Sequence, residues 1–293
     1  MPKTIVVTGA SRGLGLAIVR ALDREKDVDF VLGVRDVRSG EAVAKTLARP
    51  ARVAELDVGT RASVKAFART IEGPLHALVN NAGLQFFEPG APTPDGVEPT
   101  LAVNHLGALD LTLALLPQLE GGRVMGIGSG THNPEHEGAR RAGYRGGVFT
   151  SIERLARGET TATGAYAQGR ERYATSKLLV TVTAMELARR FPATTFLTFD
   201  PGLMPGTGLA RTSAWYGRLL WSTVLKWIAP LMDDTSTPER SAASARGLLI
   251  EPGVVSGEVY DHEGALSQRV WPEARNPDLA RRVLDESLAF LGR

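Results

Sequence analysis

The chain has 293 residues, of which 43% are hydrophobic and 23% are charged, as in an ordinary globular protein with a large core. Its 34 basic and 32 acidic residues nearly balance, so the charge does not favour a nucleic-acid partner. The absence of cysteine excludes disulfides, thiolate metal sites and a cysteine nucleophile. Because no long uninterrupted apolar span or signal segment is evident either, we expect a cytoplasmic protein.

A short apolar run at residues 4–10 predicts a buried parallel strand at the N-terminus. Glycines stand at positions 9, 13 and 15, and a helical pattern begins at residue 16. This order of elements suits the pyrophosphate of a dinucleotide, because glycines allow close backbone approach and free N–H groups at a helix start bind negative charge. The alternative is a tight turn without a ligand, which the order of elements makes less favoured.

The second predicted strand, residues 30–36, ends where the adenosine ribose of a dinucleotide is expected. Arg35 lies near this strand end and Arg12 lies within the glycine turn. Two guanidinium groups favour the 2′-phosphate of NADPH, because arginine makes charge-assisted bidentate contacts. Asp36 keeps NADH open, since an acidic residue at this place binds the ribose 2′-hydroxyl. We expect NADPH (NADP) rather than NADH.

Strands alternate with helices along the rest of the chain, which predicts a parallel sheet with right-handed crossovers. Further strands are expected at 51–58, 76–83, 121–129 and 257–262, and helices at 60–72, 104–117, 164–190, 238–251 and 277–292. Ligands of such sheets lie at the carboxyl ends of the strands. Asp57, residues 80–83 and Ser129 are therefore expected at one edge.

Tyr173 and Lys177 lie four residues apart in the predicted helix over 164–190. This spacing places both side chains on one helical face, but many unrelated proteins have such a pair. From the spacing alone, the pair is either the chemical centre of an enzyme or an incidental surface pair.

Seven short motifs occur along the chain: TGASRGLG (8–15), LDV (56–58), NNAG (80–83), VNHLG (103–107), Ser129, YATSK (173–177) and DPG (200–202). They come in the order found in the short-chain dehydrogenase/reductases, which the chain resembles over nearly its whole length. The resemblance implies a doubly wound Rossmann fold in a single domain, residues 1–293. It also implies hydride transfer between a nicotinamide and a carbonyl or alcohol.

The resemblance implies four catalytic residues. Tyr173 would be the general acid/base, Lys177 its partner, Ser129 the hydrogen-bonding partner of the substrate oxygen, and Asn104 the holder of a water relay. A nearby ammonium favours a phenolate, so we expect Lys177 to lower the pKa of Tyr173.

The resemblance and the strand-end reasoning together imply a wide cofactor site. Its expected residues are Gly9, Ser11, Arg12, Gly13, Leu14, Gly15, Arg35, Asp57, Val58, Asn81, Ala82, Gly83, Tyr173, Lys177, Pro201 and Gly202. Asn80 matches the structural asparagine of the fourth strand in the family. The segment after the DPG motif, to about residue 207, would close over the nicotinamide.

The chain departs from compact family members in two segments. An insertion at about 133–165 separates Ser129 from Tyr173, and a loop of this length is a lid, a binding loop or disordered. Its arginines would suit an acidic substrate, but glutamates are interspersed and favour a mixed solvated surface. His132 and His136, just before and within it, have ligand spacing, yet we expect no metal, since Pro134 interrupts any common helical face.

The second segment, about 203–235, is expected to be a helical substrate lid. Residues 213–232 hold four closely spaced aromatic side chains, Trp215, Tyr216, Trp221 and Trp227. The alternatives are a helix packed on the core and an interfacial membrane helix, and the sparse basic face makes membrane contact less favoured.

We therefore expect an NADPH-dependent reductase of an apolar, bulky carbonyl substrate, resembling the retinol-dehydrogenase-like members. Light-dependent protochlorophyllide reductases have a similar insertion and are the first alternative, although Leu203 stands where they have a functionally important cysteine. A non-catalytic dinucleotide sensor is the second, and the complete set Asn104, Ser129, Tyr173 and Lys177 disfavours it. The insertion precedes a helix that relatives use for dimer packing, so we expect a monomer.

Overall fold

The structure is a computed structural model that describes residues 2–88, 90–204 and 235–293. The segment predicted to be the substrate lid lies almost entirely outside these residues, as does the aromatic stretch at 213–232.

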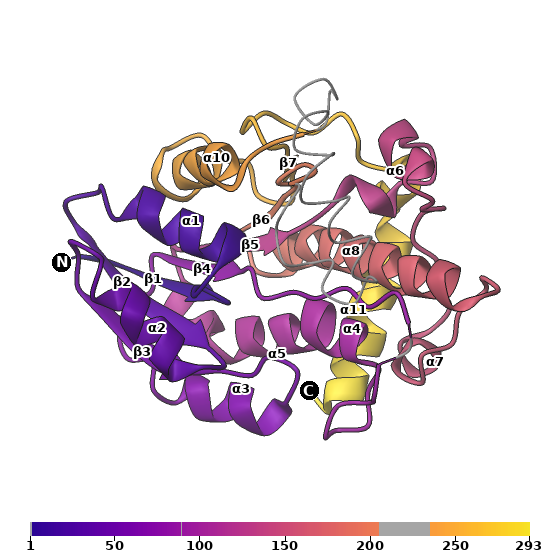
Figure 1. Cartoon of the computed structure of the whole chain (residues 1–293), viewed down its shortest axis with the longest axis horizontal. Coiled ribbons are helices and arrows are strands. Elements are labelled where there is room, and N and C mark those ends of the chain that lie inside the picture. The colour runs from indigo at the N-terminus through magenta and orange to yellow at the C-terminus, as the bar shows by residue number, and fades with distance from the viewer. Residues whose placement is uncertain (1, 89, 205–234) are drawn as a thin grey trace.

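Seven parallel strands form one sheet in the order β3-β2-β1-β4-β5-β6-β7 (Figure 1). They are β1 (Lys3–Thr8), β2 (Val28–Val34), β3 (Ala51–Glu55), β4 (Ala77–Asn80), β5 (Arg123–Ile127), β6 (Thr195–Phe199) and β7 (Val259–Tyr260). The order reverses between β1 and β4, which is the switch point at which doubly wound folds bind ligands. The predicted parallel α/β sheet is confirmed, although β6 was not singled out from the sequence and β7 is shorter than predicted.

Helices cover both faces of the sheet (Figure 1). The described α-helices outside the insertion are α1 (Gly13–Leu22), α2 (Val37–Ala44), α3 (Arg61–Ala68), α4 (Pro99–Leu101), α5 (Gly107–Ala114), α8 (Ala165–Arg190), α10 (Pro238–Ile250) and α11 (Pro277–Leu291). Successive side chains of a strand point to opposite faces of the sheet, so the strands contribute to two separate hydrophobic cores. On one face, Val6 packs with α3, α5, α8 and α11. On the other face, Val7 packs with α1 and α10.

The insertion contains two short helices, α6 (Glu137–Arg141) and α7 (Ile152–Ala156). Ile152 is fully buried in the core beside α8 and α11, and its N–H donates to a Glu286 carboxylate oxygen at 2.9 Å. The second half of the insertion is therefore part of the core. Only its first half, around α6, lies beside the candidate site described below.

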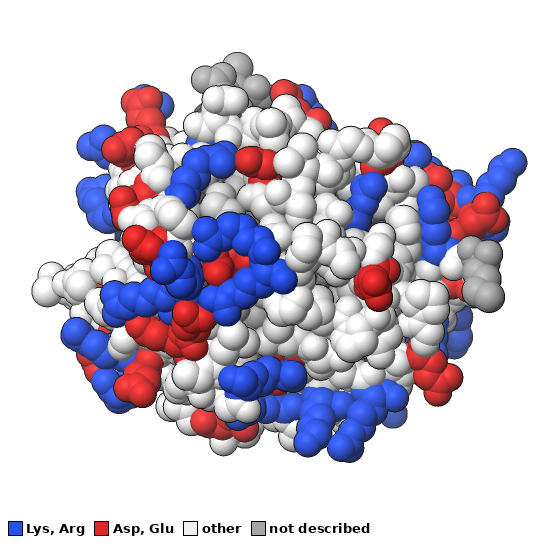
Figure 2. All heavy atoms as spheres, turned by 180° about the vertical axis from the view of Figure 1, so that it is seen from behind, with Lys and Arg blue, Asp and Glu red and all other residues white. Residues whose placement is uncertain are grey.

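Several charged side chains of the described surface form ion pairs. Within the insertion, Glu159 binds both Arg154 and Arg157, at 2.6 and 2.9 Å. Figure 2 shows basic and acidic side chains interspersed on the face opposite to that of Figure 1. These pairs agree with a mixed solvated surface for the insertion arginines.

No helix within the described ranges combines the length and the apolar character that crossing a lipid bilayer requires.

Candidate active site

The turn between β1 and α1 has the geometry of a phosphate cradle. Gly9 has a φ of 65°, and a Cβ on Gly15 would lie only 2.4 Å from Asn81 Nδ2 and 2.6 Å from the Gly9 carbonyl oxygen. No side chain caps the first turn of α1, so its N–H groups remain available to an anion. These residues fit the pyrophosphate of a dinucleotide, with Ser11, Arg12, Gly13 and Leu14 on the same turn.

Asn81 connects this turn to β4. Its Nδ2 donates to the Thr8 carbonyl at 2.8 Å and to the Gly9 carbonyl at 3.3 Å. The Thr8 hydroxyl accepts the N–H groups of Asn81 and Ala82, at 3.0 and 2.9 Å. The side chain that shapes the glycine turn is thus Asn81, while Asn80 donates to the Thr112 hydroxyl of α5 at 2.8 Å. Both asparagines hold the local structure, and Asn81 is the one in contact with the glycine turn.

Asp36, just after the end of β2, is the N-cap residue of α2, and its carboxylate is hydrogen-bonded within the protein. Its carboxylate accepts the N–H of Arg38 at 3.1 Å and the hydroxyl of Ser39, which together cap the helix. The Ser39 hydrogen bond, partly opposed by desolvation, lowers the pKa of Asp36. Arg35, one residue earlier, is exposed.

At the end of β3, Asp57 stabilises its own turn. Its N–H donates to Ser63 Oγ at 2.9 Å and its Oδ1 accepts the N–H of Gly59 at 3.0 Å. Val58 is buried beside it. This turn lies at the same edge of the sheet as the glycine turn, as the sequence predicts for both residues.

Tyr173 and Lys177 lie on α8 and are both buried, so they are not an exposed surface pair. The Lys177 ammonium lies 5.4 Å from the centre of the Tyr173 ring and donates to the Ile127 carbonyl at the end of β5, at 2.8 Å. Ser129 follows Ile127 by two residues, just beyond the end of β5.

Burial controls the protonation of this pair. It raises the pKa of Tyr173, Tyr144 and Asp200 raise it further, and a hydrogen bond with Ser129 lowers it. Burial also lowers the pKa of Lys177 to about 8, against the opposing effect of Asp200. The expectation that the pKa of Tyr173 is lowered is therefore wrong for this structure, because desolvation, together with Tyr144 and Asp200, exceeds the opposing hydrogen bond with Ser129. A protonated phenol beside an ammonium is a proton donor for an oxygen that gains negative charge.

Asn104 lies in the π-helical segment η1 (Ala102–Leu106), between α4 and α5. Its side chain bonds both backbone groups of Leu84, each at 2.9 Å, and donates to the Ser176 hydroxyl at 3.0 Å. Ser176 precedes Lys177, so Asn104 connects the segment after β4 to α8. The local π geometry permits this approach, since such bulges re-aim helical groups.

The loop after β6 carries the last predicted cofactor residues. Pro201 is buried and its carbonyl accepts the hydroxyl of Ser241 from α10 at 2.8 Å. The Gly202 N–H donates to Asp200 Oδ1 at 3.0 Å. Both residues lie at the carboxyl edge of the sheet, with Ala82 and Gly83 at the end of β4.

Sequence reasoning missed two residues that line this site. The ring of Tyr144, from the insertion, lies 6.2 Å from that of Tyr173, and its hydroxyl accepts a bond from Gln85 Nε2 at 2.6 Å. Burial raises the pKa of Tyr144. No spacing in the sequence indicates this contact, since it depends on how the insertion folds back over α8.

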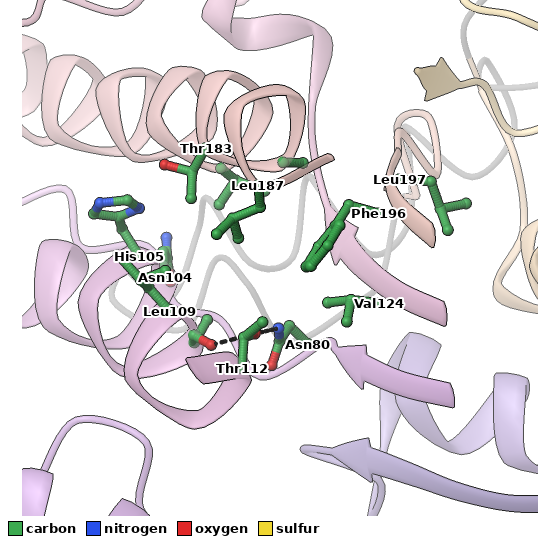
Figure 3. Close-up of a pocket in the computed structure, with 14 residues that line it drawn as sticks. Asn80, Asn104, His105, Leu109, Thr112, Val124, Thr183, Leu187, Phe196 and Leu197 are labelled. Atoms are coloured by element: carbon green, nitrogen blue, oxygen red, sulfur yellow. Dashed lines mark hydrogen bonds between the residues drawn. The ribbon is translucent and has the colours of Figure 1, made fainter. Parts of the chain in front are cut away.

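A separate cavity of about 50 Å³ lies between α5, α8 and the sheet (Figure 3). Its lining is mostly apolar, with polar side chains from Asn80, Asn104, His105, Thr112 and Thr183. Its volume suits one or a few water molecules and is far too small for a dinucleotide or a bulky substrate. The candidate active site is instead the edge of the sheet between the glycine turn and Tyr173.

Comparison with known proteins agrees with this geometry. The model of a family described as short chain dehydrogenase matches residues 3–143. Mouse polyprenol dehydrogenase is 33% identical, over 92% of this chain and 82% of its own. Human retinol dehydrogenase 13 is 30% identical over 99% and 85%, and protochlorophyllide reductase B of Oryza sativa subsp. japonica is 27% identical over 99% and 77%.

Solved structures share the fold. An alcohol dehydrogenase from the archaeon Thermococcus sibiricus, complexed with 5-hydroxy-NADP, matches with a TM-score of 0.63 and 23% identity, over 93% of this chain and 99% of that one. A serine dehydrogenase complexed with NADP+ matches with a TM-score of 0.62 and 21% identity, over 88% and 93%.

Proposed function

Because this chain belongs to the short-chain dehydrogenase/reductase family and is an NAD(P)-dependent oxidoreductase, we propose that it uses NADPH to reduce an apolar, bulky aldehyde or ketone, or oxidises the corresponding alcohol. The observation that carries this proposal is the buried Tyr173–Lys177 pair beside Ser129, at the sheet edge that also holds the glycine turn. The names of its relatives, polyprenol and retinol dehydrogenases, support an apolar substrate.

The proposed chemistry assigns a separate role to each residue of the candidate site. NADPH, when bound, supplies the hydride. Tyr173, held protonated by burial, gives its proton to the substrate oxygen, and the Ser129 hydroxyl stabilises the same oxygen. Lys177 places positive charge near the phenolate that forms. Asn104 positions the catalytic helix through Ser176.

The proposal is tested by following NADPH consumption in the dark, with a series of straight-chain aldehydes of increasing length and their cyclic and aromatic ketone counterparts. Catalytic efficiency that rises with apolar size supports it. Activity confined to short, polar carbonyls would contradict it.

Light-driven reduction of a tetrapyrrole double bond is the second candidate, favoured by 27% identity to protochlorophyllide reductase B. It predicts turnover of protochlorophyllide under illumination and none with any carbonyl compound in the dark. A non-catalytic sensor is set aside, because the family membership and the intact buried pair indicate an enzyme.

Replacing Arg35 by alanine tests the cofactor preference. Asp36 already caps α2, which leaves Arg35 as the strand-end group suited to a 2′-phosphate. We expect the KM for NADPH to rise about 10- to 100-fold, as for loss of a charge-assisted bond, with the KM for NADH little changed. Arg24→Ala is the control, since this exposed arginine follows α1 at the other edge of the sheet. Equal effects on both cofactors would contradict the NADPH assignment.

The pH dependence of the reduction rate tests whether the reaction needs the positive charge of Lys177. Lys177 has a pKa of about 8, so it carries its charge below that pH and loses it above. Because the charge stabilises the phenolate formed during reduction, we expect kcat/KM for the carbonyl substrate, which reports the ionisation of the enzyme before substrate binds, to be flat below about pH 8 and to fall above it. The Lys177→Arg variant, which stays charged, should show no fall in this range. A wild-type rate that holds constant through pH 10 would exclude this role.

We also propose that the enzyme is a monomer in solution. The insertion places α7 against α11, which in turn packs on the catalytic helix α8. Light scattering is expected to give a mass near 31.3 kDa, and twice that value would reject the proposal.

A further inference from the structure

His132 uses both of its ring nitrogens within the protein. Nδ1 lies 2.7 Å from the carbonyl oxygen of Ser129, and Nε2 lies 3.2 Å from the backbone nitrogen of Trp271. A backbone N–H only donates and a carbonyl only accepts, so the proton must be on Nδ1 and Nε2 must be bare. With the residue 3% exposed, burial lowers the pKa of His132 and keeps the ring neutral.

The carbonyl that His132 binds belongs to the residue proposed to contact the substrate oxygen. Ser129 begins the short turn η3 (Gly130–His132). Within that turn, Ser129 Oγ accepts the N–H of Thr131 at 3.3 Å and its hydroxyl at 3.1 Å. As both bonds are accepted, the single hydrogen of the Ser129 hydroxyl remains available to Tyr173 or, once substrate is bound, to the substrate oxygen.

The same turn is attached to two segments far away in the sequence. The Asn133 side chain donates to the Arg269 carbonyl at 3.0 Å, next to the Trp271 bond. On the other side, the Gly147 N–H of the insertion donates to the His132 carbonyl at 3.0 Å. His132 therefore joins the strand end that carries Ser129, the insertion and the segment 269–271.

We propose that His132 is a positioning residue for Ser129. Its Nδ1–H holds the Ser129 carbonyl, and its Nε2 fixes the ring against the Trp271 N–H, so that the serine hydroxyl keeps its direction toward Tyr173. The inference rests on the role of Ser129 proposed above. It gives a function to a histidine for which the sequence predicted neither a metal nor any other role, and both ring nitrogens are engaged in bonds within the protein.

The tautomer is tested without any substrate. In protein with ¹⁵N-labelled histidine, the NMR signals of His132, assigned with the His132→Asn variant, are expected to show a protonated Nδ1 and an unprotonated Nε2 at neutral pH. The opposite tautomer, or a charged ring, would overturn the proposal.

Two substitutions separate the two bonds. Asparagine places an amide N–H₂ near the position of Nδ1, so His132→Asn keeps the donor to Ser129 and loses the Trp271 contact. Glutamine reaches the position of Nε2 with its carbonyl oxygen, so His132→Gln keeps the Trp271 contact and loses the donor. We expect kcat for NADPH-dependent reduction of decanal to fall about 10- to 100-fold in His132→Gln and only a few-fold in His132→Asn, with the KM for NADPH unchanged in both.

If His132 had a purely structural role, the kcat of each variant would follow its melting temperature. It would not depend on whether the variant keeps a hydrogen-bond donor to the Ser129 carbonyl. The Ser129→Ala variant completes the design. If His132 acts through Ser129, His132→Gln adds no further loss in a Ser129→Ala background. Additive losses would overturn the inference and leave the proposed function intact, whereas full activity in Ser129→Ala would overturn the role of Ser129 itself and the inference with it.

Discussion

The Tyr173→Phe variant is expected to lose carbonyl reduction by about 10²- to 10⁴-fold, the usual contribution of a positioned acid. The substitution removes one oxygen and keeps the ring, so the packing around α8 is retained. Burial keeps the phenol protonated, and its ring lies 5.4 Å from the Lys177 ammonium. We expect NADPH to bind nearly as in the wild type, because Lys177 and the glycine turn are unchanged.

This prediction is checked by steady-state kinetics together with a fluorescence titration of NADPH. Tyr144→Phe is the matched control, since it removes a second phenol whose ring lies 6.2 Å from that of Tyr173. The control should change substrate KM more than kcat. If Tyr173→Phe retains most of its kcat while Tyr144→Phe loses it, the two tyrosines have exchanged the roles given to them here.

The Gly107→Ala variant is expected to be destabilised by at least about 1–3 kcal/mol, the usual effect of overpacking. Gly107 begins α5, and a Cβ there would lie 1.7 Å from the carbonyl oxygen of Val58 and 2.9 Å from that of Ala102. These obstacles are backbone atoms, so the helix must move away from the end of β3. The movement would also displace Asn104, three residues earlier, and weaken NADPH binding at the Asp57–Val58 edge.

Urea unfolding measures the loss of stability. Gly247→Ala in α10 is the control, because its added Cβ meets only the Glu251 side chain, at 3.7 Å. Alanine is the better helix former by about 1 kcal/mol, so this variant should be as stable as the wild type or more stable. A Gly107→Ala protein with unchanged stability would show that α5 does not approach Val58 this closely.

Local features of the sequence were sufficient to predict the parallel sheet of this enzyme and its glycine-rich turn. The apolar run before Gly9, the glycine spacing and the alternation of strands with helices depend on neighbours in the chain, and they led to the parallel sheet and the cradle. The order of the motifs then indicated the family and the pair Tyr173 and Lys177. Asp36 was considered from the sequence only as the ribose ligand of the NADH alternative, whereas its hydrogen bonds to Arg38 and Ser39 make it the cap of α2.

Contacts between distant segments were decided by the tertiary structure alone. Nothing in the spacing distinguishes Asn81 from Asn80 as the residue that holds the glycine turn, or brings Tyr144 to Tyr173. Nor does it join His132 to Trp271, 139 residues later. The protonation of Tyr173 and Lys177 was also decided by the fold. The sequence places an ammonium near a phenol, whereas only folding determines how much water is removed from both. Periodicity and adjacency are properties of the chain, but burial and the meeting of remote groups are properties of the packed molecule.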